Sequence, residues 1–451
     1  MSCHLPFSIP ICALGIALVA GVPGVLAAQA TPPTPAPKAP LPNRVNDVLP
    51  DWLRVRAEFR ERAERFEGAG FVRDRDDAYY LSRFRLNATV TPSRSLSFQA
   101  QVQDARVADK SIGPTTAPFK GPFDLRLAFA QFGNAKSPVA VQAGRIELVV
   151  DDQRLVGNLP WTNTARSWDG AHVTYTNEAF QLDTFAASLV RSLQGEFDKS
   201  GAGNRFAGAY LQTTKLIPQV SLMPFAFWKR DVNLHSESGP QANLSETTLG
   251  GRGSGRLPAH LDYAITVAKQ FGSLGADDVD AWAGHWQVRE SFPGRLAFKV
   301  MSEYNYASGD ANSQDGRRGT FDQLYPTGHD KLGLSDQVGW RNISHIREGI
   351  EFSPLKATPI TVNYHSWWLA DKADGLYAAS GALVARVASG ATDRHVGQEL
   401  DLFVNRAITP QLQLQAGYAH IFTGAFLKQA TPGASYSYPY VMATYVFLAE
   451  K

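Results

Sequence analysis

Leu53 to Glu64 reads LRVRAEFRERAE, and Tyr79 to Thr91 reads YYLSRFRLNATVT. In both stretches, charged or polar residues alternate one by one with apolar residues. Because successive side chains of a strand point to opposite faces, each stretch predicts a β-strand with one polar and one apolar face. We call the alternate residues that share one face of a strand a parity. The polar parity consists of Arg54, Arg56, Glu58, Arg60 and Arg62 in the first stretch, and of Arg83, Arg85, Asn87 and Thr89 in the second.

The same alternation recurs along the chain, with no long helical pattern between the repeats. It predicts an all-β protein, a transmembrane antiparallel β-barrel of about 18 strands. Besides the two stretches above, the clearer candidates are 95–103, 124–133, 180–190, 260–270, 281–289, 294–306, 347–353, 358–369, 397–405 and 411–421. The weaker candidates are 139–149, 169–175, 205–214, 220–231, 244–253 and 438–448.

The charged residues of the polar parity favour a water-filled barrel over the alternative, a soluble protein of several sheets. Half-buried strands of a soluble sandwich also alternate. Charged side chains are costly in a dry core, however, and are natural in a wet lumen. The charged residues concerned are Arg54, Arg56, Arg83, Arg85, Lys299, Glu303, Glu399 and Asp401.

Composition agrees with a barrel and excludes some other classes. Aromatic residues make up 11% of the 451 residues, which suits aromatic belts at the two membrane interfaces. We assign Trp367, Trp368, Tyr438, Tyr440, Tyr445 and Phe447 to these belts. The 44 basic and 42 acidic residues nearly cancel, so nothing in the overall charge favours nucleic-acid binding.

The N-terminal region predicts export. Residues 14–28 are apolar and small, and Ala28-Gln29-Ala30 offers a signal-peptidase site, so residues 1–30 are read as a cleaved signal peptide. A membrane anchor or a buried helix is the alternative. Residues 31–50 hold seven prolines, which disfavour helix and strand, and are read as a Pro-rich linker before a barrel over 51–451. Both cysteines lie within residues 1–30, so cysteine catalysis and Cys-type metal sites are not expected in the mature chain.

The connections alternate between short and long, as in outer-membrane barrels. Residues 91–94 and 409–410 are predicted as periplasmic turns, and the longer polar stretches are predicted as external loops. The stretch 307–340 is long enough to gate the entrance. The predicted external loops are 104–122, 307–340, 370–396 and 424–437.

Five segments together resemble one known family. They are SRFRLNATVTPSRSLSFQAQVQDAR (82–106), AGRIELVVDDQRLVGNLPWTNTARSWDGAHVTY (143–175), YNYASGD (304–310), FDQLYPTGHDKLGLSDQVGWRNI (321–343) and YHSWWLADKADGLY (364–377). Their combination resembles the alginate export family of outer-membrane proteins. The resemblance implies a bacterial outer-membrane location and an 18-stranded barrel with a positively charged lumen. It also implies passage of an anionic polysaccharide outward, with periplasmic export partners, or of another small anionic or polar solute in either direction.

Arginine on the lumen parity suggests how such a solute would be handled, because guanidinium groups can replace part of the hydration of a passing carboxylate. The alternative is that these charges pair across neighbouring strands and stiffen the wall. The residues expected to line the conducting surface are Arg56, Arg83, Arg85, Arg126, Arg145, Arg154 and Arg166. Their expected counter-charges are Glu147, Asp152 and Asp169.

Other functions receive less support. No serine nucleophile elbow, P-loop or dinucleotide fingerprint is present, so we expect a channel without enzymatic activity or cofactor. The acidic run 277–280 lacks regular ligand spacing and is read as a solvated turn, not as a Ca²⁺ site. An uptake porin for small sugars or organic acids is the main alternative to polysaccharide export. A barrel enzyme such as an outer-membrane lipase or protease, and a surface adhesin or structural barrel without conductance, are further alternatives.

Overall fold

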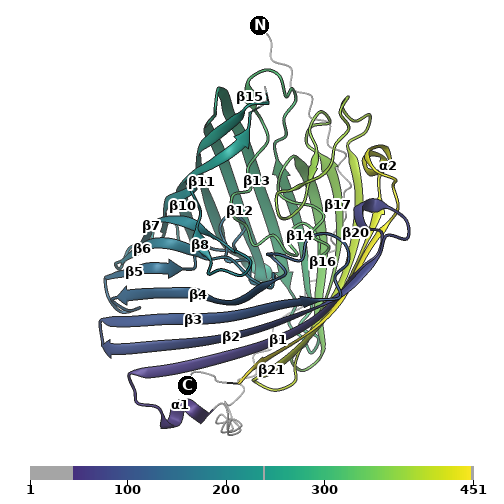
Figure 1. Cartoon of the computed structure of the whole chain (residues 1–451). Helices are drawn as coiled ribbons and strands as arrows, with labels where there is room; N and C mark the ends of the chain where they lie inside the picture. Colours follow the sequence, from purple (N-terminus) through teal and green to yellow (C-terminus); the bar gives the residue numbers. More distant parts are fainter. Residues whose placement is uncertain (1–43, 237–238, 448–451) are drawn as a thin grey trace. The chain divides into compact units, whose positions relative to one another are not determined.

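A computed structural model describes residues 44–236 and 239–447 of the protein (Figure 1). Of the 20 strands in its main sheet, β8 (Lys199–Ser200) and β15 (Arg317–Arg318) are two-residue additions, and the other 18 form the wall of a closed antiparallel barrel. A separate hairpin is formed by β18 (Leu376–Tyr377) and β19 (Leu383–Ala385). Within these described ranges, no helix is long and apolar enough to cross a membrane.

The helices are short; one precedes the first strand, and the others lie in the connections between strands. They are α1 (Val45–Val48), η2 (Ala69–Phe71), η3 (Pro258–His260) and α2 (Ala425–Ala430). The wall strands are β1 (Leu53–Phe66), β2 (Asp77–Ser93), β3 (Leu96–Ala108), β4 (Gly121–Phe132), β5 (Val139–Ile146), β6 (Trp168–Thr176), β7 (Gln181–Arg191), β9 (Arg205–Gln212), β10 (Val220–His235), β11 (Gln241–Leu257), β12 (Leu261–Leu274), β13 (Asp277–Ser291), β14 (Lys299–Ala307), β16 (Ile343–Leu355), β17 (Thr358–Leu369), β20 (His395–Ala407), β21 (Leu412–Thr423) and β22 (Tyr436–Val446).

The barrel closes where its first strand pairs with its last strand. Phe59 of β1 lies opposite Tyr445 of β22, and on its other side it lies opposite Phe84 of β2. Closure removes the free sheet edges, so every wall strand has two hydrogen-bonded neighbours. The predicted all-β barrel of about 18 antiparallel strands is therefore confirmed.

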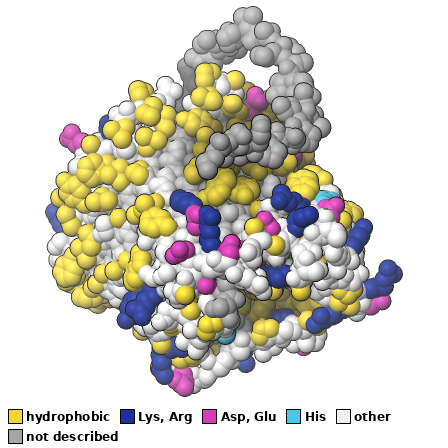
Figure 2. Space-filling view, turned by 90° about the horizontal axis from the view of Figure 1, so that it is seen from above, with side chains coloured by type: hydrophobic (Ala, Val, Ile, Leu, Met, Phe, Trp, Pro, Cys, Tyr) yellow, Lys and Arg dark blue, Asp and Glu magenta, His cyan; other side chains and the backbone are white. Residues whose placement is uncertain are grey.

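The two faces of the wall follow the predicted alternation. Phe59 and Leu400, on the outward parity of β1 and β20, are 40% and 47% exposed. Arg60 of β1 and Arg83 of β2 lie on the other parity and are buried inside the barrel. In a view from above, hydrophobic side chains occupy much of the rim, and charged side chains gather over the middle (Figure 2). The lumen therefore carries the charge, and the apolar face is turned outward.

The connections differ in length at the two ends of the barrel. At one end they are short, such as the connections between β2 and β3 and between β16 and β17. At the other end, three connections are long, and each contributes residues to one buried hydrophobic cluster: 147–167, 308–342 and 370–394. We name them the first, second and third inner loops.

Several local predictions were wrong. The strand predicted over 139–149 ends at Ile146, because the chain then turns into the lumen as the first inner loop. The Pro-rich segment 31–50 contains one turn of helix, α1, in its proline-free part. Three aromatic residues assigned to the membrane interfaces, Trp367, Tyr438 and Tyr440, are instead buried on the lumen side. The predicted signal peptide and residues 31–43 lie outside the described residues.

Candidate functional site

The first inner loop crosses the lumen and packs against the second. Its apolar residues Leu148, Val150, Leu155 and Val156 are buried in the same hydrophobic cluster as Phe321 and Tyr325 of the second inner loop, and Val156 forms a backbone bridge with Tyr325. The backbone amide of Gly157 donates to the carbonyl oxygen of Tyr325 at 2.8 Å. Together the two loops form a packed layer inside the barrel, so the space left between this layer and the wall is the candidate functional site.

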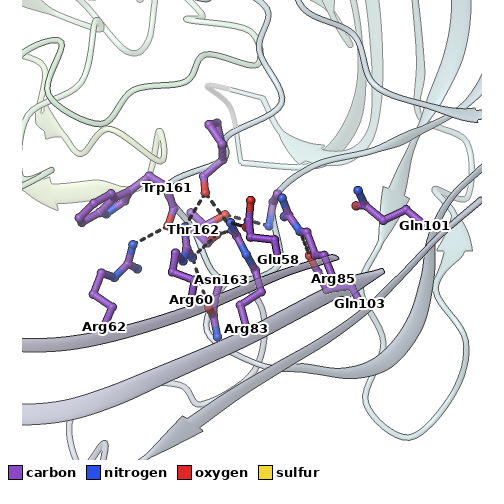
Figure 3. A network of polar contacts seen from close by, with 12 residues as sticks. Glu58, Arg60, Arg62, Arg83, Arg85, Gln101, Gln103, Trp161, Thr162 and Asn163 are labelled. Atoms are coloured by element: carbon purple, nitrogen blue, oxygen red, sulfur yellow. Dashed lines mark hydrogen bonds and ion pairs between the residues drawn. The ribbon is translucent and has the colours of Figure 1, made fainter. Parts of the chain in front are cut away.

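Arginines of the wall point into the lumen, and several of them contact the first inner loop (Figure 3). Arg60 and Arg62 project from β1, Arg83 and Arg85 from β2, and Arg126 from β4. The two from β1 and the two from β2 lie on the lumen parity of their strands. Arg126 is placed by a β-bulge, since the pairing of β3 with β4 shifts register beside it, and a bulge re-aims the side chain it carries.

Three of these arginines bind the backbone carbonyl groups of consecutive loop residues. Arg60 donates to the carbonyl oxygens of Pro160 at 2.9 Å and Thr162 at 3.1 Å. Arg83 donates to the same two oxygens at 3.0 and 3.2 Å. Arg62 donates to the carbonyl oxygen of Trp161 at 2.6 Å. The turn at Pro160 to Thr162, which we name the capped turn, is therefore held by guanidinium groups from two strands.

Carboxylates compensate only part of this positive charge. Glu58 accepts from Arg83 at 2.7 Å, and Glu64 pairs with Arg62 at 2.5 Å. Arg85 donates to the side chain of Gln103 at 2.7 Å, and its Nη2 is buried without a hydrogen-bond partner among the described residues. A buried donor without a partner is costly, so this guanidinium offers an unused site for an anionic or polar group.

Two residues predicted for the conducting surface, Arg126 and Glu147, pair with each other. Glu147 begins the first inner loop and also accepts from Asn158 at 2.9 Å. Burial would raise the pKa of Glu147, but the neighbouring guanidinium of Arg126 outweighs it and holds that pKa below its usual value. Glu147 is therefore ionised at neutral pH, and it ties the start of the loop to β4.

Arg166 and Arg154 anchor the inner loops. Arg166 donates to the carbonyl oxygens of Gly157 at 2.9 Å and Tyr325 at 2.5 Å. Burial lowers its pKa to about 10, which leaves it charged at neutral pH. Arg154 donates to Asn305 at 3.0 Å and pairs with the fully buried Glu303 of β14 at 3.1 Å. Both arginines were predicted to line the channel, and their donors are largely engaged in holding the loops.

Asp152 is the remaining predicted counter-charge of the first inner loop. It lies 3.5 Å from Arg154 and 3.2 Å from Arg252 of β11. Burial opposes ionisation, but these two guanidinium groups hold the pKa of Asp152 below its usual range. The carboxylate is therefore shared between an arginine of the loop and an arginine of β11 in the wall.

Arg145 and Asp169 do not face the lumen. They lie opposite each other on β5 and β6, on the parity of Ala128 and of the exposed Phe132 and Val139. Arg145 binds Asp169 through two hydrogen bonds of 2.8 and 3.1 Å. The prediction that this pair lines the conducting surface is contradicted by its outward parity. The alternative, a cross-strand pair that stiffens the wall, describes it correctly.

Arg56 lies exposed on the lumen parity of β1, at the short-turn end of the barrel, below the arginines that bind the capped turn. Arg60 and Arg62 share its parity but were not among the residues predicted for the conducting surface. The alternation that selected Arg56 would also have selected them. No pattern in the sequence indicates the role of Trp161 and Thr162 in the capped turn, because residues of a loop do not alternate between two faces.

A second buried network holds the second inner loop on the wall strands β14, β16, β17 and β20. Its side chains follow one another across four strands: Asn305 contacts His345 at 2.9 Å, His345 contacts His365 at 2.9 Å, and His365 contacts Asp401 at 3.1 Å. Asp401 and Glu399 accept from the backbone amides of Leu334 at 3.1 Å and Ser335 at 3.2 Å. The predicted wet environment of Glu303, Glu399 and Asp401 is wrong, because the inner loops cover these carboxylates.

A cavity of about 420 Å³ remains beside the capped turn. Its lining combines Arg62 and Arg166 with Trp161, His329 and Tyr436. The indole of Trp161 lies between the guanidinium of Arg62, at 3.9 Å, and the imidazole of His329, at 3.7 Å. The open space is therefore bordered by the arginines of the wall and by stacked rings of the loops.

Comparison with known proteins agrees with the architecture. The chain resembles OpdQ of Pseudomonas aeruginosa (TM-score 0.59, 10% identity, 90% of this chain and 98% of that chain covered). It also resembles OccK3 (OpdO) of P. aeruginosa (0.58, 14%, 87% and 95%) and OccAB2 of Acinetobacter baumannii (0.57, 11%, 87% and 97%). At these identities the likeness shows the fold alone. No curated protein sequence matches the chain.

The sequence match is more specific than the structural likeness. The family model for alginate export matches residues 51–440, which is most of the chain. The proteins of this family are transport channels. The chain therefore belongs to the alginate export family, and it is a β-barrel channel of the bacterial outer membrane.

Proposed function

We propose that this channel passes anionic solutes, with small acidic sugars related to alginate as the preferred class. One observation carries the proposal: the arginines of β1, β2 and β4 converge on one side of the lumen, and Glu58, Glu64 and Glu147 compensate them only in part. Guanidinium groups bind carboxylates in charge-assisted, often bidentate geometry. Several weak sites in sequence allow passage, whereas one tight site would trap the solute.

The inner loops support a small solute over a polymer. Buried ion pairs and backbone hydrogen bonds hold the first and second inner loops inside the lumen. The cavity beside the capped turn is about 420 Å³, which is within the range of a site for a small molecule. A polysaccharide chain would require these loops to move.

Export of an anionic polysaccharide is the second candidate, because the family is named for alginate export. In that case periplasmic partners would deliver the polymer at the short-turn end, where Arg56 lies exposed. We also propose that residues 1–30 are removed as a signal peptide, that residues 31–50 link it to the barrel, and that transport without catalysis is the protein's activity. N-terminal sequencing of the mature protein tests the cleavage.

Ion selectivity in planar bilayers tests the main proposal. In a salt gradient, the reversal potential of the purified channel should have the sign that indicates a preference for anions. Arg85→Glu should reduce or reverse this potential, because the lumen loses two units of positive charge. Arg406→Glu is the matched control, because Arg406 is exposed on the outward parity of β20. A wild-type channel without anion preference, or equal effects of both substitutions, would contradict the proposal.

Solutes of different size and charge distinguish transport of small acidic sugars from export of a polysaccharide. Glucuronate and short oligouronates should block the ion current of the wild-type channel, whereas glucose should have a much weaker effect because it lacks the carboxylate. Current block by a long polyuronate from the short-turn side, with none by glucuronate, would instead favour polysaccharide export.

A further inference from the structure

We propose that Arg60 and Arg83 form a carboxylate-binding site, and that the carbonyl groups of the capped turn occupy this site when the channel is empty. The inference deepens the proposed function, since it assigns a specific binding step to an anionic solute. An entering carboxylate would replace the carbonyl oxygens of Pro160 and Thr162 and release the turn.

The geometry is that of a bidentate pair. Nη1 of Arg60 donates to the carbonyl oxygen of Pro160, and Nη2 donates to that of Thr162, at 2.9 and 3.1 Å. A planar guanidinium presents these two donors side by side, and a carboxylate fills them with its two oxygens. Nη1 of Arg83 reaches both acceptors from the neighbouring strand. The two carbonyl oxygens therefore occupy the positions of the two oxygens of a carboxylate.

The net charge of the site favours replacement of the carbonyl groups of the turn by a carboxylate. Arg60 and Arg83 are directly opposite each other in register, an arrangement in which like charges repel. Glu58 neutralises only one of them, through Arg83, and the carbonyl groups of the turn carry no net charge. A carboxylate would supply the missing negative charge, and charge-assisted hydrogen bonds are about twice as strong as neutral ones.

The contacts of the turn limit how far it would move. On one side, the amide of Leu159 donates to the hydroxyl of Thr327 at 3.0 Å. On the other, the side chain of Asn163 donates to the carbonyl oxygens of Ser82 and Phe119, each at 3.0 Å. Between these anchors, the contacts of the turn with the described part of the wall are those of the arginines and of Trp161. The displacement would therefore be confined to residues 160–162, and Trp161 would leave its stack with them.

A spin label on the turn tests the inference. The labelled protein is the full chain with Pro160→Cys, Cys3→Ser and Cys12→Ser, reconstituted in lipid vesicles; Pro160 is exposed, and the substitution keeps its carbonyl group. Sodium glucuronate should raise the mobile fraction of the label at least about twofold, because the stronger acceptor displaces the turn. Glucose and sodium chloride at the same ionic strength should not.

Variants and a second label position complete the test. Arg60→Lys removes the fork but keeps the charge, and Arg83 still donates to both carbonyl oxygens. The turn should therefore stay in place, and the label should respond to glucuronate much less than in the labelled protein with Arg60. A label at Lys136, in the exposed short turn between β4 and β5, should report no change. Heat-dependent migration in gels checks that each variant barrel is folded.

The outcomes separate this inference from the proposed function. A selective wild-type channel whose turn label ignores glucuronate would overturn the inference and leave the proposed function standing. A responsive label in a channel without anion preference would overturn the proposed function only. An equal response to chloride and glucuronate would show a general effect of salt and would also overturn the carboxylate site.

Discussion

Arg60 of β1 and Arg83 of β2 lie opposite each other in register, and both donate to the carbonyl oxygen of Pro160, at 2.9 and 3.0 Å. Two like charges at this position would destabilise the pair of strands. Glu58 and the loop carbonyl groups offset the repulsion. The wall and the first inner loop therefore depend on each other, and a change in either should alter both conduction and the position of the loop.

Arg85 and Arg145 were both predicted to line the conducting surface, but they lie on opposite faces of the wall. We expect Arg145→Gln to leave the reversal potential unchanged, because its guanidinium faces away from the lumen and pairs with Asp169. The substitution should lower the free energy of unfolding by about 1 kcal/mol, as for a partly exposed ion pair. Arg85→Gln should reduce anion preference instead. Measured reversal potentials that shift equally for both variants would contradict the assigned faces.

Sequence predicts the wall better than the contents of the lumen. Alternation is a local property, so it identified β1 and β2 and the lumen parity of Arg83 and Arg85. The same rule would have placed Arg145 outward, because it shares the parity of Val139, Val141 and Ala143. For a residue of a wall strand, parity decides the face, and the charge of Arg145 is accommodated on the outer face by Asp169.

The inner loops could not be predicted in this way. Leu148, Val150 and Val156 resemble strand residues, but they are buried because they pack against a loop more than 150 residues further along the chain. Such long-range packing leaves no periodic pattern. The position of Arg126 depends on a bulge, which reverses parity within β4 and is likewise invisible to a simple alternation.

The ion pair between Arg154 and Glu303 should control how firmly the first inner loop is held. We expect Glu303→Gln to lower the free energy of unfolding by about 3 kcal/mol, because among the described residues it leaves the buried guanidinium of Arg154 with the more distant Asp152, at 3.5 Å, as its charge partner. Conductance should become larger and noisier as the loop loosens. Glu348→Gln is the control, since Glu348 is exposed on the outward parity of β16. Urea unfolding in vesicles and single-channel recording measure both effects, and equal losses for the two variants would contradict the anchoring role.

The segment between β7 and β9 should respond to pH. Burial raises the pKa of Asp198 to about 7, and the neighbouring carboxyl group of Asp124 adds to this shift. Since the pKa in an unfolded segment is about 4, the docked segment binds the proton more tightly, and its stability falls as pH rises from about 4 through the raised pKa.

Hydrogen exchange at the amide of Leu193, which donates to Asp198 at 2.8 Å, measures this effect. Its protection factor should be higher at about pH 5 than at about pH 8. Asp198→Asn should remove the dependence, because the amide side chain does not titrate. A pH dependence that persists in this variant would assign the titration to another group.

Trp161 should limit the open space beside the capped turn. Its indole is stacked between Arg62 and His329 and meets the ring of Tyr440 edge to face at 4.9 Å. Trp161→Ala should therefore increase single-channel conductance by enlarging the cavity of about 420 Å³. It should also lower the free energy of unfolding, though by less than the roughly 3–5 kcal/mol of a fully buried ring. Trp228→Ala is the control, because Trp228 is 37% exposed on the outward face of β10. If both variants conduct like the wild-type channel, Trp161 does not border the conducting path, and the path must run on another side of the inner loops.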